Sequence, residues 1–422
     1  MKFLYSDSLD FVDPEYDFHL DRNAGGRRAH EDDQFPHEHL DRAPYDGILI
    51  SRAIVGDARR LGKYTQAQCL RFSREGARNF LRYPLEKFPG SIIMGDCGAF
   101  SYRNLPLPPY SVEDTLEFYE DSGFTHGCSV DHVILTFDET LPRPTAEMRR
   151  RYDVTLENAR QFIRKARHLK GFVPIGVVQG WSPKSLAAAA DSLTKMGYRY
   201  LAIGGLVPLK IRQIALALRA IRDSVPTNVQ LHLLGFGKTT ELQLLRSLNV
   251  QSFDTTSPLL RAFKDGERNY YALRSDGELE YYIAIRIPQA LDNQKLLRRA
   301  KKGRLDQERL IKMEAAALAA VRGVGAKKCA ATEAVDSVVA YGRYALWNEK
   351  LSDEQNERRL KKLKVAYRRT LSDRPWERCA CRVCRELGVE SLVFRSSNRN
   401  KRRGIHNLHV FYESIRALES RS

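Results

Sequence analysis

SIIMGDCGAFSYRN (91–104) and NVQSFDTTSPLLRAF (249–263) are the two stretches of this sequence that decide its fold. In each, a short apolar run of the kind that forms β-strands leads to an acidic residue, Asp96 in the first and Asp254 in the second. Parallel α/β barrels carry their chemistry at the carboxyl ends of their strands. We therefore expect both carboxylates at one end of such a barrel. The alternative is that each only caps the helix that follows it.

Further β-type runs recur along the chain, with helical stretches between them. The runs lie at 48–51, 91–95, 132–137, 172–178, 199–204, 230–235 and 250–254. This alternation predicts parallel βα units, and the predicted fold class is therefore α/β, a TIM-type (β/α)8 barrel. Seven strands are assigned in this way and the eighth is not. The stretch 270–288 instead predicts a hairpin that turns at Ser275-Asp276-Gly277 and decorates the barrel.

Two carboxylates that converge on one site suit the chemistry of glycosidic bonds. One attacks the anomeric carbon, while the other transfers a proton to and from the departing group. The small residues Gly95, Gly98 and Ala99 surround Asp96, so a flat ligand can approach the main chain closely there.

Four residues of metal-ligand type lie near the end of the sequence. Cys379, Cys381 and Cys384 form the motif CACRVC, and His406 follows after twenty-one residues. Three thiolates and one imidazole make a closed tetrahedral site, which suits structural zinc and leaves no open position for catalysis. His409 is a rival fourth ligand. Seven cysteines in 422 residues without a signal peptide indicate a reducing compartment, so we expect zinc rather than disulfides and a cytoplasmic protein.

The formal net charge of +17 implies a polyanionic partner. The excess of Lys and Arg lies beyond residue 290, in KLLRRAKKGR (295–304), ERRLKKLKVAYRR (357–369) and RSSNRNKRR (395–403). No apolar run is long enough to span a bilayer, so no membrane partner is expected.

These patterns divide the chain into three expected regions. A catalytic barrel with an N-terminal extension occupies 1–290, a basic helical insertion 291–370, and a zinc-binding subdomain with a closing helix 371–422.

The stretch AALAAVRGVGAKKCAATEAV (316–335) resembles a helix-hairpin-helix segment. In such a segment Gly323 and Gly325 would let main-chain amides approach a phosphate, flanked by Lys327 and Lys328. The alternative is an ordinary joint between two helices. In the same way, the charged stretch 357–369 can be simply a solvated helix face.

Taken together, the motifs resemble those of the tRNA-guanine transglycosylase superfamily, whose members exchange a guanine base for a 7-deazaguanine on a zinc-bearing TIM barrel. By this resemblance, MGDCGAF makes Asp96 the general acid/base and Phe100 a ring that stacks on the base. SFDTTSP makes Asp254 the covalent nucleophile, and VDHVILTFDETLPRP makes Asp138 the residue that reads the purine edge. GVVQGW, LAIGGLV and LHLLGFG supply the expected lining of the base-binding site: Gln179, Gly180, Gly204, Gly205, Leu206, Leu234 and Gly235. The CxCxxC…HN pattern carries the zinc ligands over as Cys379, Cys381, Cys384 and His406.

The sequence departs from the superfamily pattern beside both carboxylates. Ser101 stands where a glutamine is usual, and Thr256-Ser257-Pro258 replaces the sequence PTR after the nucleophile. These departures affect the expected contacts to the polynucleotide more than those to the base. The stretches 1–18 and 45–55 resemble a divergent branch, DpdA, which inserts 7-cyano-7-deazaguanine (preQ0) into DNA.

The resemblance implies a pentosyltransferase that exchanges guanine in DNA for 7-cyano-7-deazaguanine through a covalent Asp254 intermediate. The two carboxylates are expected about 5 Å apart, as in retaining glycoside chemistry. The expected partners are DNA and accessory proteins of a DNA-modification system. Two alternatives stay open: a tRNA-guanine transglycosylase with the same chemistry on RNA, and a catalytically idle nucleic-acid-binding subunit.

Overall fold

The computed structural model describes residues 1–57, 62–141, 143–237, 242–301, 303 and 305–420. It divides into two compact units, the first made of residues 1–9 and 45–256 and the second of 10–44 and 257–421. The main boundary therefore falls directly after the last barrel strand, and the expected boundary at residue 290 has no counterpart. Lys302 and Arg304 of the first basic run lie outside the described residues.

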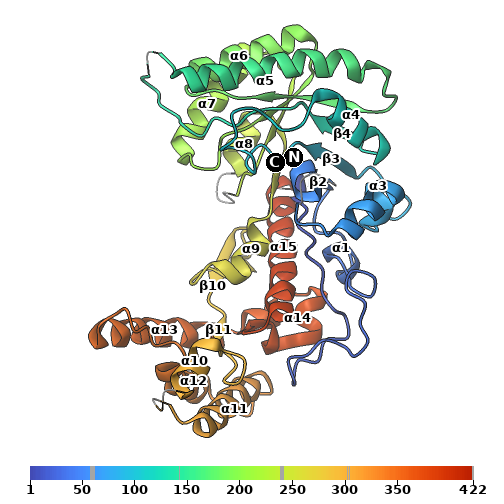
Figure 1. Cartoon of the computed structure of the whole chain (residues 1–422). Helices are drawn as coiled ribbons and strands as arrows, with labels where there is room; N and C mark the ends of the chain where they lie inside the picture. Colours follow the sequence, from blue (N-terminus) through green and yellow to red (C-terminus); the bar gives the residue numbers. More distant parts are fainter. Residues whose placement is uncertain (58–61, 142, 238–241, 302, 304, 421–422) are drawn as a thin grey trace. The chain divides into compact units, whose positions relative to one another are not determined.

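A closed barrel of eight parallel strands forms the first unit (Figure 1). Each strand pairs with the next one along the chain, and the last strand pairs with the first. The strands are β1 (Lys2–Ser6), β2 (Gly47–Ser51), β3 (Ile92–Asp96), β4 (His126–Cys128), β5 (Val173–Val178), β6 (Tyr200–Ile203), β7 (Gln230–Leu233) and β8 (Val250–Thr255). The prediction of a TIM-type α/β barrel is confirmed.

The strand that the sequence patterns leave unassigned is β1, which pairs with β2 on one side and β8 on the other. The strand predicted at 132–137 is wrong, because the chain at 129–138 has no regular structure and β4 ends at Cys128. Gly127 in β4 is needed for packing, since a Cβ there would lie 2.5 Å from the rings of Tyr119 and Phe172. Glycine in a strand weakens its sequence signal, and the apolar run that follows packs as a buried loop.

Helices on the outside of the barrel alternate with the strands. Several begin at capping residues: Thr65, Ser111 and Ser182 each accept a hydrogen bond from the main-chain N–H three residues later. The helices of the first unit are α2 (Arg52–Val55), α3 (Gln66–Phe80), α4 (Val112–Asp121), α5 (Ala146–Lys165), α6 (Pro183–Met196), α7 (Ile211–Ser224) and α8 (Leu242–Ser247), with a 3-10 turn η1 (Ala166–His168). One buried cluster brings together residues of six of the strands: Leu4, Leu49, Ile92, Met94, Cys128, Ile175, Val177, Tyr200 and Ala202.

The second unit is mostly helical. Its helices are α1 (Pro36–His39), α9 (Ser257–Lys264), α10 (Gln294–Lys301), α11 (Gln307–Gly325), α12 (Ala331–Ala345), α13 (Asp353–Asp373), α14 (Arg382–Leu387) and α15 (Ser397–Ser420), with 3-10 turns η3 (Pro375–Arg378) and η4 (Gly388–Leu392). Its strands are β9 (Tyr270–Leu273), β10 (Leu279–Tyr282), β11 (Ile285–Arg286) and β12 (Val393–Phe394). Among the helices in the described part of the chain, none is both long and apolar enough to cross a membrane.

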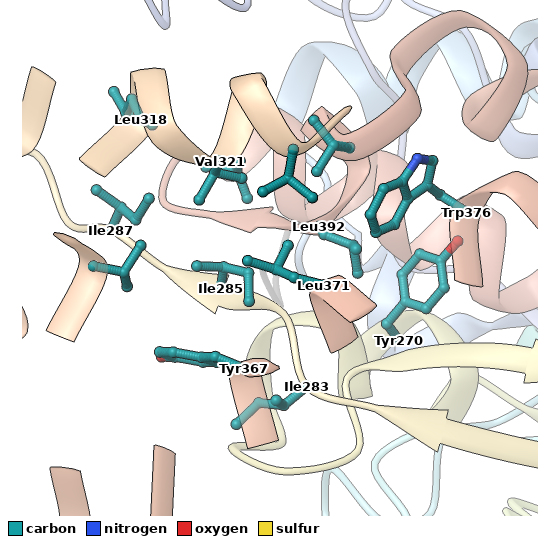
Figure 2. Packing of buried hydrophobic residues seen from close by; sticks show 14 of the residues in the cluster. Tyr270, Ile283, Ile285, Ile287, Leu318, Val321, Tyr367, Leu371, Trp376 and Leu392 are labelled. Atoms are coloured by element: carbon teal, nitrogen blue, oxygen red, sulfur yellow. The ribbon is translucent and has the colours of Figure 1, made fainter. Parts of the chain in front are cut away.

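The predicted hairpin exists as the antiparallel pair β9–β10. It forms a two-stranded sheet of its own in the second unit, however, and so does not decorate the barrel as expected. The chain after β10 then enters the core of the second unit, where Ile283, Ile285 and Ile287 pack against helical residues such as Val321 and Leu371 (Figure 2).

The basic run 395–403 is largely internal to the second unit. The guanidinium of Arg399 is 1% exposed and pairs with Asp21 at 2.5 Å. Arg403, fully buried, donates to the carbonyl of Ala262 at 2.6 Å, and Arg402 donates to the carbonyl of Asp13 at 2.7 Å. The expectation that this run belongs to a basic surface is therefore wrong for these arginines, which hold segments of the second unit together.

Candidate active site

The carboxyl ends of the barrel strands carry a group of polar side chains. Asp96 is the last residue of β3, Asp254 lies one residue before the end of β8, and Gln179 directly follows β5. A further carboxylate, Asp131, lies three residues beyond the end of β4. Because all strands of a parallel barrel end at the same face, these four side chains share the face that carries catalysis in TIM-type enzymes.

Hydrogen bonds hold both carboxylate oxygens of Asp254, which is 5% exposed. Its Oδ2 accepts from the hydroxyl of Ser6 at 2.5 Å, and its Oδ1 accepts from the main-chain N–H of Gly235 at 2.9 Å. One donor comes from the end of β1 and the other from the turn after β7. The orientation of this carboxylate is therefore fixed, as an attacking group requires.

A chain of buried polar groups reaches Asp254 from inside the barrel. The hydroxyl of Tyr200 lies 2.5 Å from Ser252 Oγ, which lies 2.6 Å from His232 Nδ1. His232 Nε2 is 3.2 Å from Asp254 Oδ1. If the Ser252 hydroxyl donates to Nδ1, the proton of the imidazole is on Nε2 and points at Asp254. No sequence motif singled out His232, which lies in β7 and has a fully buried side chain.

Asp96 has the opposite environment. Its Oδ1 is buried and has no hydrogen-bond partner among the described residues. Burial raises the pKa of Asp96 to about 7; a hydrogen bond from Ser51 opposes the rise, and the negative charges of Asp254 and Asp131 add to it. A carboxyl group with a pKa near neutrality suits proton transfer in both directions.

Asp131 is the centre of a buried hydrogen-bonded cluster. Its Oδ2 accepts from the amide of Gln179 at 2.7 Å, and its Oδ1 accepts from the thiol of Cys97 at 3.0 Å. The hydroxyl of Tyr102 donates to the main-chain carbonyl of Asp131 at 2.8 Å. Burial raises the pKa of Asp131, and its hydrogen bonds from Cys97 and Gln179 lower it. The sequence analysis missed this residue.

Asp138, which the sequence resemblance selected to read the purine edge, lies on an exposed loop. Its Oδ1 accepts from the N–H and the hydroxyl of Thr140 at 2.8 and 2.9 Å. Those hydrogen bonds lower the pKa of Asp138. The strand of this stretch ends at Cys128, so the acid nearest the strand end is Asp131, seven residues before Asp138. The structure joins Asp131 to Gln179 and leaves the Asp138 carboxylate in solvent.

The small residues of the site make room for other groups. A Cβ on Gly204 would lie 2.2 Å from Gln179 Nε2, and one on Gly205 would lie 2.5 Å from the carbonyl oxygen of Ile134. Gly205 also has a φ of +72°, which favours glycine. These positions at the end of β6 admit the Gln179 amide and the loop beside it.

The remaining predicted residues differ in exposure. Phe100 follows Asp96 in a turn and is 53% exposed, with the Arg103 guanidinium 4.5 Å from its ring centre. Leu206 is buried, and Leu234 packs against the barrel core. A Cβ on Gly180 would lie 2.8 Å from Ser185 Oγ, so this glycine allows α6 to start close to β5.

The four predicted metal ligands come together in the second unit. One ligand atom from each of Cys379, Cys381, Cys384 and His406 lies within 4.8 Å of the others. His406 Nδ1 is 3.6, 3.4 and 3.2 Å from the three sulfur atoms, and its Nε2 lies 2.8 Å from the carbonyl of Tyr271. This contact directs Nδ1 toward the thiols. The cluster can hold a metal ion such as zinc, and His409 is outside it.

In the structure, the two glycines of the predicted phosphate-binding hairpin lie in a helix and pack against neighbouring side chains. Gly323 and Gly325 are helical residues of α11, and a Cβ on them would meet Cys329 Cβ at 2.8 Å and Val389 Cγ1 at 2.6 Å. The amides of Lys327 and Lys328 donate to carbonyls within the turn, which leaves them no free hydrogen for a phosphate. Only the exposed side chains of the two lysines face solvent.

Comparison with known proteins agrees with this geometry. No protein-family model matches the chain. It is 38% identical over 420 residues to a Salmonella montevideo protein named DNA-guanine transglycosylase, covering 98% of this chain and 96% of that protein. Two proteins named tRNA-guanine(15) transglycosylase also match, one from Methanopyrus kandleri at 23% identity over 52% of this chain and 45% of its own length, the other from Nanoarchaeum equitans at 27% identity over 43% and 42%. With a full-length relative at this identity and a barrel that gathers acidic residues at one end, the chain belongs to the guanine transglycosylases, which are pentosyltransferases.

Proposed function

We propose that the protein exchanges guanine in DNA for 7-cyano-7-deazaguanine, as the DpdA branch of the superfamily does. The observation that carries this proposal is the 38% identity to a DNA-guanine transglycosylase over nearly the whole of both chains. The tRNA-guanine transglycosylases align with only about half of this chain or less. The protein would act in the cytoplasm, with accessory proteins of a DNA-modification system.

The exchange would proceed by two displacements at C1′ of the sugar. An Asp254 oxygen attacks C1′, the bond from C1′ to N9 of guanine breaks, and the bonding electrons leave with the base, which takes a proton from Asp96. The incoming 7-deazaguanine then gives its N9 proton to Asp96 and attacks C1′, which releases Asp254. Two inversions retain the configuration at C1′.

Asp131 takes the role of reading the base in this proposal, in place of Asp138. Its carboxylate is an acceptor that suits the N–H groups of a purine edge, and Gln179 already orients it from the neighbouring strand end. The exposed ring of Phe100 is suited to stack on the base, and Gly205 and Leu206 to contact it through their main chain. His232 acts on the nucleophile only through its hydrogen bond to Asp254.

Zinc in the Cys3His cluster would be structural. Three sulfurs and Nδ1 of His406 would supply the four ligands that a structural zinc site needs, which would leave no position for substrate. Tyr270 supports this set, because its ring stacks on the His406 imidazole with centroids 4.1 Å apart and its hydroxyl lies 3.2 Å from Cys384 Sγ. The ion would join the segment that directly follows η3 to α14 and α15.

The choice of polymer is tested by exchange assays with labelled 7-cyano-7-deazaguanine. We expect incorporation into DNA, none with Asp254→Asn, and unchanged incorporation with the surface control Asp223→Asn on α7. Nucleoside analysis of DNA and tRNA from cells with and without the protein extends the test to the natural setting. Incorporation into tRNA but never into DNA would make the protein an RNA enzyme.

Asp131→Asn and Asp138→Asn test which acid reads the base. We expect Asp131→Asn to lower kcat/KM by roughly 10- to 100-fold, since a buried hydrogen bond to a charged group is lost. Asp138→Asn should stay within about twofold, because its carboxylate is solvated. A large loss in Asp138→Asn together with normal activity in Asp131→Asn would return the role to Asp138.

The raised pKa of Asp96 predicts a pH dependence. The first displacement needs protonated Asp96, so kcat/KM should fall about tenfold per pH unit above a pH of about 7. A single-turnover assay of base release from pH 6 to 9 measures this, and a flat profile would contradict the assignment.

The thermal stability of the protein gives a second test of the raised pKa of Asp96. The pKa of Asp96 is higher in the folded protein than in the unfolded chain, so the unfolded chain loses this proton at a lower pH. The free energy of unfolding therefore decreases as pH rises from about 4 to 7. Asp96→Asn should therefore raise Tm relative to the native protein at pH 8 more than at pH 4. Equal shifts at both pH values would show that Asp96 is not protonated near neutrality.

The metal site predicts about one zinc per chain. Cys381→Ser should lose the metal and lower Tm by about 10 °C or more, because metal binding contributes to folding. Cys329→Ser, a thiol of the same unit outside the cluster, should change neither. Full zinc occupancy in Cys381→Ser would show that the ligand set is wrong.

A further inference from the structure

Three adjoining cavities lie between α13 and the β9–β10 hairpin in the second unit. Their volumes are about 790, 580 and 420 Å³. Glu267 lines all three, Tyr281 and Arg369 line the first and second, and Ile283 and Lys362 line the second and third. Because they share these lining residues, the three cavities are neighbours, and we refer to them together as the groove.

Cations outnumber acids in the lining of this groove, with nine Lys and Arg residues against two Glu. Four of the nine pair with acidic side chains: Arg274, Arg358, Arg369 and Arg378. Of the two Glu, Glu280 is already paired with Arg369 at 2.5 Å and with Arg378 at 3.4 Å. Lys361 and Lys362 are exposed, and the structure gives them no hydrogen bond or ion pair with any described residue. The groove is thus complementary to a polyanion.

The middle cavity adds apolar and aromatic surface to this charge. Along α13, Arg358, Lys362, Val365 and Arg369 recur at helical spacing and line one wall. Val365 is 68% exposed between these cations. The opposite wall contains Tyr281 and Tyr282, and the guanidinium of Arg369 lies 4.5 Å from the ring centre of Tyr282.

Cations and apolar surface in one groove match a single polynucleotide strand better than a duplex. A duplex presents phosphates outward and keeps its bases stacked inside, so its bases could not contact Val365 and Tyr281. An unpaired strand presents phosphates and bases together, and proteins that bind single strands combine a basic groove with aromatic platforms. The proposed exchange also needs unpaired bases, because a guanine inside a duplex cannot reach a carboxylate.

We propose that this groove binds an unpaired stretch of the DNA substrate, with phosphates on Lys361 and Lys362 and a base against Val365 and Tyr281. The inference deepens the proposed function and rests on it in taking DNA as the polymer. It assigns a polynucleotide site to the second unit, on residues that play no part in the chemistry of the barrel.

Binding of fluorescent oligonucleotides to the full-length protein tests the proposal. Lys361→Glu/Lys362→Glu should weaken binding of a single-stranded DNA by tenfold or more and reduce the slope of log K against log salt by about 1.4, at about 0.7 per phosphate contact. Val365→Ser should weaken the same binding severalfold without changing the salt slope. Duplex binding should fall less in both variants.

The matched control is Lys312→Glu/Lys350→Glu, which makes the same charge change at two exposed lysines of the second unit outside the groove. An equal loss in this control would overturn the proposal, because net charge alone would explain it. A normal Lys361→Glu/Lys362→Glu variant beside a weakened Lys327→Glu/Lys328→Glu variant would move the site to the α11–α12 turn.

These measurements are independent of base exchange. If Lys361→Glu/Lys362→Glu lost binding of a single-stranded RNA of the same sequence but bound DNA normally, the choice of DNA would be overturned. Exchange into tRNA alone would overturn the proposed function, while the groove variants would still report whether a strand binds there.

Discussion

The pairing of β1 with β8 is the interaction on which the barrel site depends. It joins residues 2–5 to residues 252–255 and closes a sheet that otherwise has two open edges. The same pairing brings Ser6 to Asp254, where its hydroxyl donates to Oδ2 at 2.5 Å. Gly235, in the turn after β7 on the other side of β8, donates to Oδ1. The proposed nucleophile is therefore oriented by barrel closure itself, because its donors come from the two strands that flank its own.

The three acids at this end of the barrel differ in whether both of their oxygens receive a hydrogen bond. Asp254 accepts from Ser6 and Gly235, and Asp131 from Gln179 and Cys97, whereas Asp96 has one buried oxygen that no described residue hydrogen-bonds. A buried carboxylate oxygen without a donor makes ionisation costly, and the hydrogen bond from Ser51 offsets this cost only in part. The raised pKa of Asp96 follows, and the charges of Asp254 and Asp131 raise it further. Roles for two similar side chains can thus be set by the placement of hydrogen-bond donors, as in other enzymes with paired carboxylates.

Much of this arrangement was predictable from the sequence, and the failures have physical causes. The barrel, the two strand-end acids Asp96 and Asp254 and the metal cluster follow from short-range patterns and tight spacing. Strand β4 was not predicted. It has only three residues, one of them a glycine required for packing against Tyr119, and the apolar run after it packs as a loop. The sequence resemblance selected Asp138, whereas the acid that the structure joins to Gln179 is Asp131. His232 was missed because a lone inward histidine in a strand carries no pattern; only the fold brings it to Asp254.

The structure was needed most to decide which of the positive charges are available to bind a polynucleotide. The value of +17 treats every Lys and Arg alike, but Arg399 and Arg403 are buried and bonded to acids or carbonyls of the second unit. Such cations release no counterions from a polynucleotide, so the charge available for binding is smaller than the composition implies. Lys361 and Lys362 pair with none of the residues that the structure describes, and they line a groove with exposed apolar surface. Cations placed in this way bind phosphates at little electrostatic cost, since no ion pair must first break.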